Sequence, residues 1–246
     1  MLIVDKIKEH RNNVPKELEG IDELDSTTKD YMLYKFLKDN LYDYPYLLEE
    51  LPVYFMEEIL INEINSYNFE RYFTDNVIKK LNEGTGKLRT ILLNHIEYAN
   101  LIPKLTTEKN YMPSSIYFNN EEKWVSISKY LALFQSRYGK KELISFLNSF
   151  NDRNSCENLF KEMEDSDFFY NALFDDDDII ELVKGNFGKN LNNDSFSKLI
   201  SKMSSLDNPN KYMNLLLDNN IYDRCKKDIS VSYLTRLLFE KDVSLI

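Results

Sequence analysis

Hydrophobic side chains recur at helical spacing along most of the chain. Apolar sets at positions i, i+3, i+4 and i+7 begin at residues 143, 156 and 196, among others, and Gly, Pro or Asn residues separate many of the neighbouring sets. The starts at 156 and 196 lie 40 residues apart, which is close to the length of a two-helix repeat. The pattern predicts an all-α protein of many short helices, arranged as an irregular helical bundle or as an α-solenoid-like stack.

One predicted helix covers residues 53–66. Pro52 suits its first turn, because the N–H that proline lacks would have no partner there in any case. Met56, Leu60 and Ile64 lie on the inward face of this helix. The other face is expected to meet solvent and carries three carboxylates, Glu57, Glu58 and Glu63.

The strongest apolar stripe follows Asn119 and Glu122, which suit a capping box. Its members share one face of the expected helix: Trp124, Ile127, Leu131, Phe134 and Tyr138. Residues 100–118 lack a helical period and contain two prolines, so we expect a linker there. The predicted domains are therefore an N-terminal helical lobe at residues 1–99 and a C-terminal helical lobe at residues 119–246.

Composition narrows the class further. The chain has only 6 Gly and 6 Pro in 246 residues, which is few for the turns of a many-stranded β fold, while 17 Tyr and 15 Phe favour a packed core. Cys156 and Cys225 are expected to be reduced, buried thiols. No apolar run approaches the ~18 residues that span a bilayer, which predicts a soluble, cytoplasmic protein. Heavy use of Asn, Lys, Ile and Tyr fits an AT-rich genome, such as that of a bacterium or a phage.

Negative charge is gathered in two stretches of the sequence. Eight carboxylates and no Lys or Arg lie between Asp39 and Glu70, where five tyrosines are interspersed, and nine carboxylates and no base lie between Glu162 and Val183. Removing these 17 charges from the net charge of −10 leaves +7 for the other residues. The acidic balance argues against direct nucleic-acid binding, because neutralising phosphates requires clustered Lys and Arg.

These stretches predict a non-catalytic protein-interaction module, such as an inhibitor, an immunity protein or an adaptor. Its acidic, tyrosine-rich helices would bind a basic surface of a partner protein, for example a nucleic-acid-handling enzyme, because opposite charges accelerate association and tyrosines supply contact area. No cofactor is expected. The residues predicted to contact the partner are Asp39, Asp43, Tyr44, Glu49, Glu50, Glu57, Glu58, Glu63, Asp175, Asp176 and Asp177.

The run of four aspartates at residues 175–178 has two further interpretations. Asp175 is well placed to cap a helix that starts at Asp176, and aspartates in a first turn stabilise a helix through its dipole. Alternatively, Asp178 and Glu181 are three residues apart on one helix face and could hold a hard cation such as Mg²⁺.

A third class of function, RNA cleavage, is suggested by a short motif. The segment from Arg89 to His95, with the sequence RTILLNH, is similar to the Arg-x(4–6)-His motif of the HEPN ribonucleases. The resemblance covers seven residues and implies an all-α, metal-independent ribonuclease that would use Arg89 and His95. A structural subunit that binds its complex through apolar faces is a further alternative.

Overall fold

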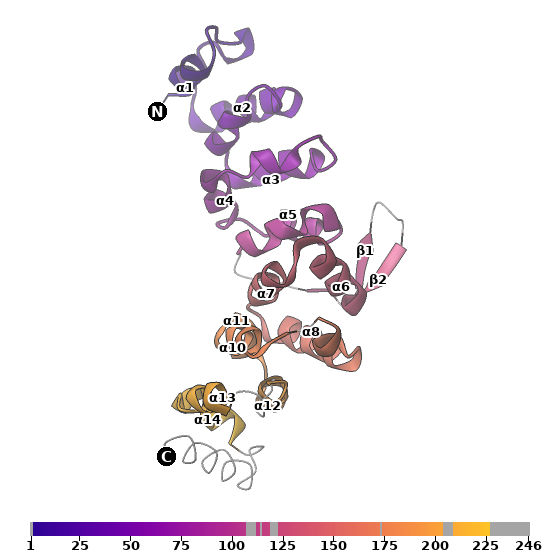
Figure 1. The fold of residues 1–246 in the computed structure, drawn as a ribbon. Coiled ribbons are helices and arrows are strands. Elements are labelled where there is room, and N and C mark those ends of the chain that lie inside the picture. Colours follow the sequence, from indigo (N-terminus) through magenta and orange to yellow (C-terminus); the bar gives the residue numbers. More distant parts are fainter. Residues whose placement is uncertain are drawn as a thin grey trace. The chain divides into compact units, whose positions relative to one another are not determined.

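The structure is a computed structural model that describes residues 2–106, 112–113, 115–118, 123–172, 174–203 and 209–226 (Figure 1). The chain divides into two compact units. The first comprises Met1–Leu93 and Lys104–Thr107, and the second comprises Asn94–Pro103 and Glu108–Ile246.

The first unit consists of short α-helices alternating with 3₁₀ turns. The α-helices are α1 (Ile3–His10), α2 (Ser26–Asn40), α3 (Val53–Asn62), α4 (Asp75–Leu81) and α5 (Lys87–Leu92). The 3₁₀ elements between them are η1 (Lys16–Leu18), η2 (Ile21–Glu23), η3 (Pro45–Glu50) and η4 (Phe69–Tyr72). Helix α2 packs on η1, η2 and α3, while α1 and α4 both pack on η3, and α3 packs on α4 and α5.

The second unit adds a β-hairpin to the same kind of helical packing. It begins with η5 (Ile96–Lys104), most of which belongs to this unit, and the antiparallel strands β1 (Ser115–Phe118) and β2 (Lys123–Ser126). The helices follow in order: α6 (Ile127–Tyr138), α7 (Lys140–Asn148), α8 (Arg153–Asp165), α9 (Phe168–Asn171), α10 (Asp176–Lys184), α11 (Asn186–Asn190), α12 (Asn193–Ser201), α13 (Pro209–Leu216) and α14 (Asn219–Cys225).

The prediction of an all-α fold with many short helices is confirmed, since the only sheet in the described parts of the chain has two strands. The apolar stripes form the cores of the two units, and Leu37, Leu60, Leu131 and Leu147 are fully buried. Because each short helix can bury only one face, it depends on its neighbours for the rest of its stability. None of the described helices is both long enough and apolar enough to cross a bilayer.

Helices α8 and α12 begin 40 residues apart and repeat one another. Asp152 and Asn192 cap them in the same way, accepting hydrogen bonds of 2.8 Å from the N–H of Ser155 and 2.9 Å from that of Ser195. The buried apolar side chains that follow occupy corresponding positions: Cys156 and Phe196, Leu159 and Leu199, Phe160 and Ile200, Met163 and Met203. The 40-residue spacing in the sequence therefore reflects two equivalent helices of the second unit.

The prediction for Trp124 was wrong. It lies on β2, is 68% exposed and pairs across the hairpin with Tyr117. The helix begins at Ile127, where the side chain of Ser126 caps it. The predicted capping pair, Asn119 and Glu122, lies outside the described residues.

The predicted linker at residues 100–118 contains regular structure at both ends. Residues up to Lys104 continue η5, in which Ala99, Leu101 and Ile102 are buried, and β1 occupies its last four positions. The predicted lobes at 1–99 and 119–246 stay a prediction, since independent folding of either part is untested. Cys156 and Cys225 are buried thiols that form no disulfide, as expected, and burial raises the pKa of Cys156 to about 12.

Candidate protein-interaction surface

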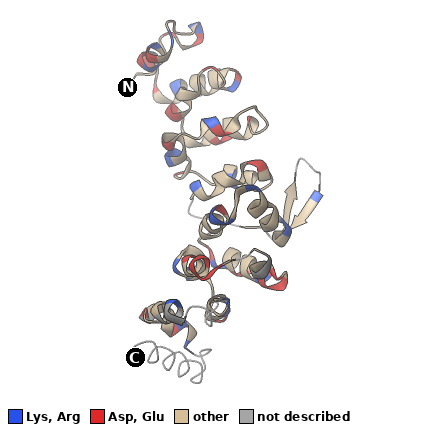
Figure 2. Cartoon of the chain, viewed as in Figure 1, with Lys and Arg blue, Asp and Glu red and all other residues tan. Residues whose placement is uncertain are grey.

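Basic side chains from elsewhere in the first unit meet the first acidic stretch. Lys6, on α1, donates to Glu49 and, at 2.6 Å, to Glu50, and Arg11 lies 3.0 Å from Asp43. Burial acts to raise the pKa of Glu49, but the hydrogen bonds from Lys6 and Asn76, together with the charges of Lys6 and Lys80, outweigh it and hold the pKa below its ordinary value. Figure 2 shows acidic and basic residues side by side on these elements. Three of the eight carboxylates of this stretch therefore have a cationic partner in the folded unit.

Two glutamates of α3 serve the packing of the first unit. Glu57 was expected to face solvent, and this was wrong: it is only 5% exposed and accepts hydrogen bonds from Thr85 Oγ1 at 2.9 Å and from the N–H of Leu88 at 3.4 Å. These contacts place its carboxylate at the start of α5, where the helix dipole favours negative charge. Glu58 is exposed, and its carboxylate accepts a hydrogen bond from the hydroxyl of Tyr34.

Several acids of the second stretch have partners as well. Asp175 caps α10 in a capping box with Asp178, as the sequence predicted, and Lys140 lies 3.0 Å from Asp175 and 2.5 Å from Asp178. The hydrogen bond from the N–H of Asp178 and the contact with Lys140 lower the pKa of Asp175. Lys211 lies 2.6 Å from Asp177, and Asp176 is half-buried in the first turn.

Two of the predicted contact residues remain without such partners. Neither Asp39, which is exposed, nor Glu63, which is half-exposed, makes a side-chain hydrogen bond or an ion pair with the described part of the chain. They lie on or directly after different helices, α2 and α3. Of the predicted acids, they are the ones with most freedom to pair with another molecule.

The tyrosines of the first stretch form an ordered surface with two arginines. We call it the tyrosine–arginine surface and define it by Arg11, Tyr42, Tyr44, Tyr46, Arg71 and Tyr72, of which Tyr72 is buried. The guanidinium of Arg71 lies 4.0 Å from the ring centroid of Tyr42 and 4.8 Å from that of Tyr72, and it donates to the carbonyl of Tyr42 at 3.0 Å. Tyr42 is nevertheless 67% exposed. Its ring is thus held in place while most of it remains accessible.

The neighbouring rings continue the same arrangement. Arg11 lies 5.0 Å from the ring centroid of Tyr44, whose ring meets Phe36 edge-on. Tyr46 stacks on His10 with centroids 3.9 Å apart and an interplanar angle of 10°, and burial raises its pKa. Contacts between a guanidinium and an aromatic face contribute about 0.5–1 kcal/mol at exposed sites. These side chains are therefore largely ordered before any partner binds.

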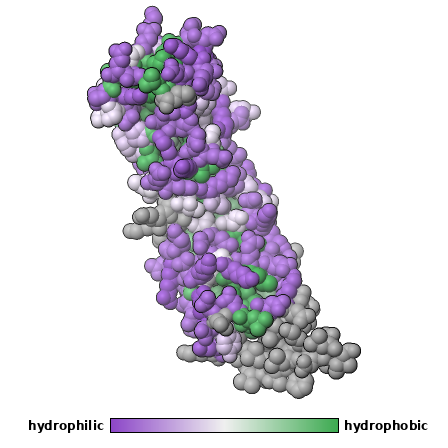
Figure 3. Space-filling model, turned by 90° about the vertical axis from the view of Figure 1, so that its left-hand side faces the viewer, coloured by the Kyte–Doolittle hydropathy of each residue, from purple (hydrophilic) through white to green (hydrophobic). Residues whose placement is uncertain are grey.

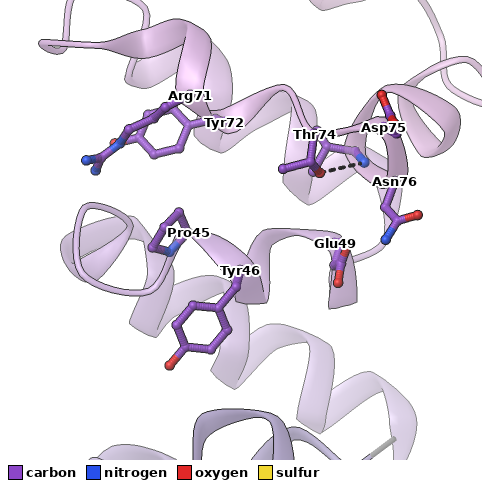
Figure 4. A pocket seen from close by; sticks show the side chains of 9 residues that line it. Pro45, Tyr46, Glu49, Arg71, Tyr72, Thr74, Asp75 and Asn76 are labelled. Carbon is purple, nitrogen blue, oxygen red and sulfur yellow. Dashed lines mark hydrogen bonds between the residues drawn. The ribbon is translucent and has the colours of Figure 1, made fainter. Parts of the chain in front are cut away.

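A groove of about 520 Å³ opens along this surface (Figure 4). Pro45 and Tyr46 of η3 lie on one side of it, and Arg71 and Tyr72 of η4 lie on the other. The start of α4 and the end of η3 line the rest with polar groups: Thr74, Asp75, Asn76 and Glu49. Thr74 Oγ1 accepts a hydrogen bond from the N–H of Val77 at 3.3 Å and caps α4. The groove thus offers aromatic faces together with charges of both signs, which suits a peptide better than a simple ion.

The residues of the ribonuclease-like motif are both buried. Arg89 is 2% exposed and belongs to the first unit, whereas His95 is 3% exposed and belongs to the second. The helix predicted to join them ends at Leu92, and Nδ1 of His95 lies 3.3 Å from Glu97. A phosphate of bound RNA would have to reach both side chains, and their burial gives that chemistry no support.

The arrangement around α10 does not favour the metal site considered for Asp178 and Glu181. Asp178 Oδ2 accepts the N–H of Asp175 at 2.8 Å and also meets Lys140, while Glu181 is exposed. The described residues contain no group of three or more His, Cys, Asp or Glu side chains suited to holding a metal ion.

Comparisons with protein-family models, curated proteins and solved structures found no match to the chain. Sequence reasoning missed Arg11, Arg71 and Tyr72 as members of the surface. Arg71 contacts Tyr42, which lies 29 residues earlier, and Arg11 contacts the distant Tyr44, and no local pattern indicates contacts of this length. Tyr72 joins the surface through its contact with Arg71. The only local feature of the sequence that indicated this surface was the cluster of Tyr42, Tyr44 and Tyr46 around Pro45.

Proposed function

We propose that the protein is a non-catalytic protein-interaction module and that its partner docks on the tyrosine–arginine surface of the first unit. The proposal rests on the side chain of Tyr42. This residue is 67% exposed, yet its ring centroid lies only 4.0 Å from the guanidinium of Arg71, which holds the ring in place. Tyr and Arg are enriched among the residues that dominate binding energy at protein interfaces. Side chains that are ordered in advance lose less conformational entropy when a partner binds.

The ion pairs that residues of the first acidic stretch form within the protein change which groups are expected to supply the affinity for the partner. A surface of unpaired carboxylates would attract a basic partner over long range and bind it with steep salt dependence. Here Asp43, Glu49 and Glu50 already have cations of their own. We therefore expect the aromatic groups to supply most of the affinity, with a modest contribution from acids such as Asp39.

The face of the molecule drawn in Figure 3 gives less support to a structural subunit that binds through apolar faces. In the view of Figure 3 the surface is mainly hydrophilic, and hydrophobic residues occur in small separate groups. An obligate interface resembles a divided hydrophobic core and needs a larger continuous apolar area.

The test compares two tyrosines of the first unit. Full-length protein would be used to isolate its partner from the source cell by affinity capture, and the affinity of that partner would then be measured for Tyr42→Ala and Tyr67→Ala. Tyr67 is 83% exposed, lies outside the surface and provides the matched control. We expect Tyr42→Ala to weaken binding about tenfold or more and Tyr67→Ala to change it less than twofold.

Raising the salt concentration from 50 to 500 mM adds a second readout. Little change in affinity would agree with an aromatic interface, whereas a loss on the order of a hundredfold would favour the acidic face predicted from the sequence. Equal effects of the two tyrosine substitutions would refute docking at this surface.

A further inference from the structure

A cleft in the second unit has a charge opposite to that of the whole chain. It has a volume of about 730 Å³, within the range of ligand-binding pockets. Helices α8, α11, α12 and α14 contribute its polar lining, which includes Arg153, Lys189, Asn190, Asn193, Asp194 and Arg224. Three cations and one carboxylate give these side chains a formal charge of +2, whereas the chain carries −10.

Arg224 supplies a partly buried cation that carbonyl groups hold in place. It donates to the carbonyls of Gly188 at 3.0 Å and of Leu191 at 2.6 Å, and its guanidinium lies 3.6 Å from the ring centroid of Phe196. Burial lowers the pKa of Arg224. The carbonyls orient the guanidinium but carry no net charge, and the carboxylate of Glu157, which forms no ion pair with Arg224, compensates only part of its positive charge.

The other two cations of the cleft are exposed and also lack an acidic partner. None of Arg153, Lys189 and Arg224 forms an ion pair with a carboxylate among the described residues. Lysines elsewhere, such as Lys140 and Lys211, do form such pairs. The cleft therefore has a local excess of positive charge available to an anionic ligand.

The start of α12 already has an anionic partner within the chain. The carboxylate of Glu157 accepts hydrogen bonds from the N–H of Asn192, from its side-chain amide at 2.7 Å and from Ser195 Oγ at 2.8 Å. The attraction for an anion comes instead from the three cationic side chains.

We propose that this cleft binds an acidic, extended peptide segment of a partner protein. Aspartate or glutamate side chains of the peptide would pair with Arg153 and Lys189, which are exposed and can reach outward. The amide groups of Asn190 and Asn193 would hydrogen-bond to the peptide backbone, because a side-chain amide offers both a donor and an acceptor. Arg224 would raise the affinity of the inner end of the cleft for a carboxylate.

A peptide fits the charge of the molecule better than a nucleic acid does. Nucleic-acid binding depends on neutralising many phosphates along a basic surface, and a surplus of two charges within a chain of −10 is small for that purpose. A short peptide with a few carboxylates requires only the local excess. This second binding site lies in a different unit from the tyrosine–arginine surface and stands or falls independently of it.

The experiment measures fluorescence anisotropy with full-length protein and a labelled hexapeptide of alternating Asp and Glu at low salt. We expect saturable binding. In the double variant Arg153→Gln, Lys189→Gln the affinity should fall about fivefold or more, because each of the two exposed ion pairs contributes a factor of about two. The charge-matched control is Lys161→Gln, Lys184→Gln, two exposed lysines outside the cleft, and it should change the affinity less than twofold.

Three results would overturn the proposal. The first is equal affinity for a hexapeptide of Asn and Gln, which would mean that carboxylates are not recognised. The second is an equal loss of affinity in the two double variants, which would indicate attraction by overall charge alone. The third is tighter binding of a single-stranded RNA oligomer than of the acidic peptide. Circular dichroism of both double variants, whose substitutions are all at exposed positions, confirms that the helices are retained.

Discussion

Glu57 on α3 accepts a hydrogen bond from the backbone N–H of Leu88, 31 residues further along the chain, and so caps the first turn of α5 from a neighbouring helix. The same carboxylate accepts from Thr85 Oγ1 at 2.9 Å. An acidic side chain that the helical pattern assigned to solvent thus fixes the position of another helix. This contact is part of the packing of the first unit.

Replacing Glu57 should therefore destabilise the protein. We expect Glu57→Ala to lower the free energy of unfolding by about 2 kcal/mol, because it leaves a buried N–H and a hydroxyl without their acceptor. Urea denaturation followed by circular dichroism measures the change. The control, Glu70→Ala, removes the same charge at an exposed position and should stay within about 0.5 kcal/mol. Similar losses in the two variants would mean that the contact to Leu88 does not stabilise the fold.

Asp22 should make the first unit sensitive to acid. It accepts from the N–H groups of Ile3 at 3.0 Å and Val4 at 2.8 Å, at the start of α1, and from Lys29 at 2.7 Å. Burial acts to raise the pKa of Asp22, but these hydrogen bonds outweigh it and hold the pKa below its usual value of 3.8. The ionised side chain therefore stabilises the fold above that value, and the contribution is lost as the pH falls through the pKa of the folded protein.

The measurement is the melting temperature between pH 6 and pH 2. Asp22→Asn should lower the melting temperature at pH 6 and reduce its fall on acidification, because asparagine cannot accept all three hydrogen bonds and does not titrate. Asp5→Asn, an exposed substitution on α1, should leave both features nearly unchanged. If the profiles of Asp22→Asn and the natural protein run parallel down to pH 2, ionisation of Asp22 does not contribute to stability.

The sequence predicts those features of the structure whose contacting residues lie close together in the chain, and it misses contacts between distant residues. The cap at Asp175 was predicted because both partners, Asp175 and Asp178, lie within one helical turn. The contacts of Lys6 with Glu49 and Glu50 join residues 43 and 44 positions apart, and no local pattern announces them. The acidic stretches appeared unpaired in the sequence because their cations come from such distant positions. The candidate surface was visible only in part, through its tyrosines.

The cap at Asp175 provides a comparison between neighbouring aspartates. Asp175→Ala should destabilise the second unit by about 1 kcal/mol, the usual cost of losing an N-terminal cap. Asp177→Ala removes an exposed carboxylate whose contact is an ion pair with Lys211, and it should cost less than about 0.5 kcal/mol. Thermal unfolding of the two variants measures the difference. A larger loss for Asp177 than for Asp175 would contradict a capping role.

The single tryptophan offers a direct check of the hairpin. Trp124 and Tyr117 face each other on the outer side of the hairpin, with ring centroids 5.4 Å apart, while Ile116, Phe118 and Val125 are buried on the other side. Trp124 and Ile127 are three residues apart, as they would be on one face of a helix, but Trp124 belongs to a strand. Successive side chains of β2 point to opposite sides of the hairpin, so Val125 is buried and Trp124 is exposed. We expect the fluorescence of the native protein to have its maximum at the long wavelength of water-exposed indole and to shift little on unfolding in urea. Acrylamide should quench it nearly as well as it quenches N-acetyltryptophanamide, the freely accessible reference. A blue-shifted, poorly quenched native emission would place Trp124 in the core, as the helical pattern alone suggested.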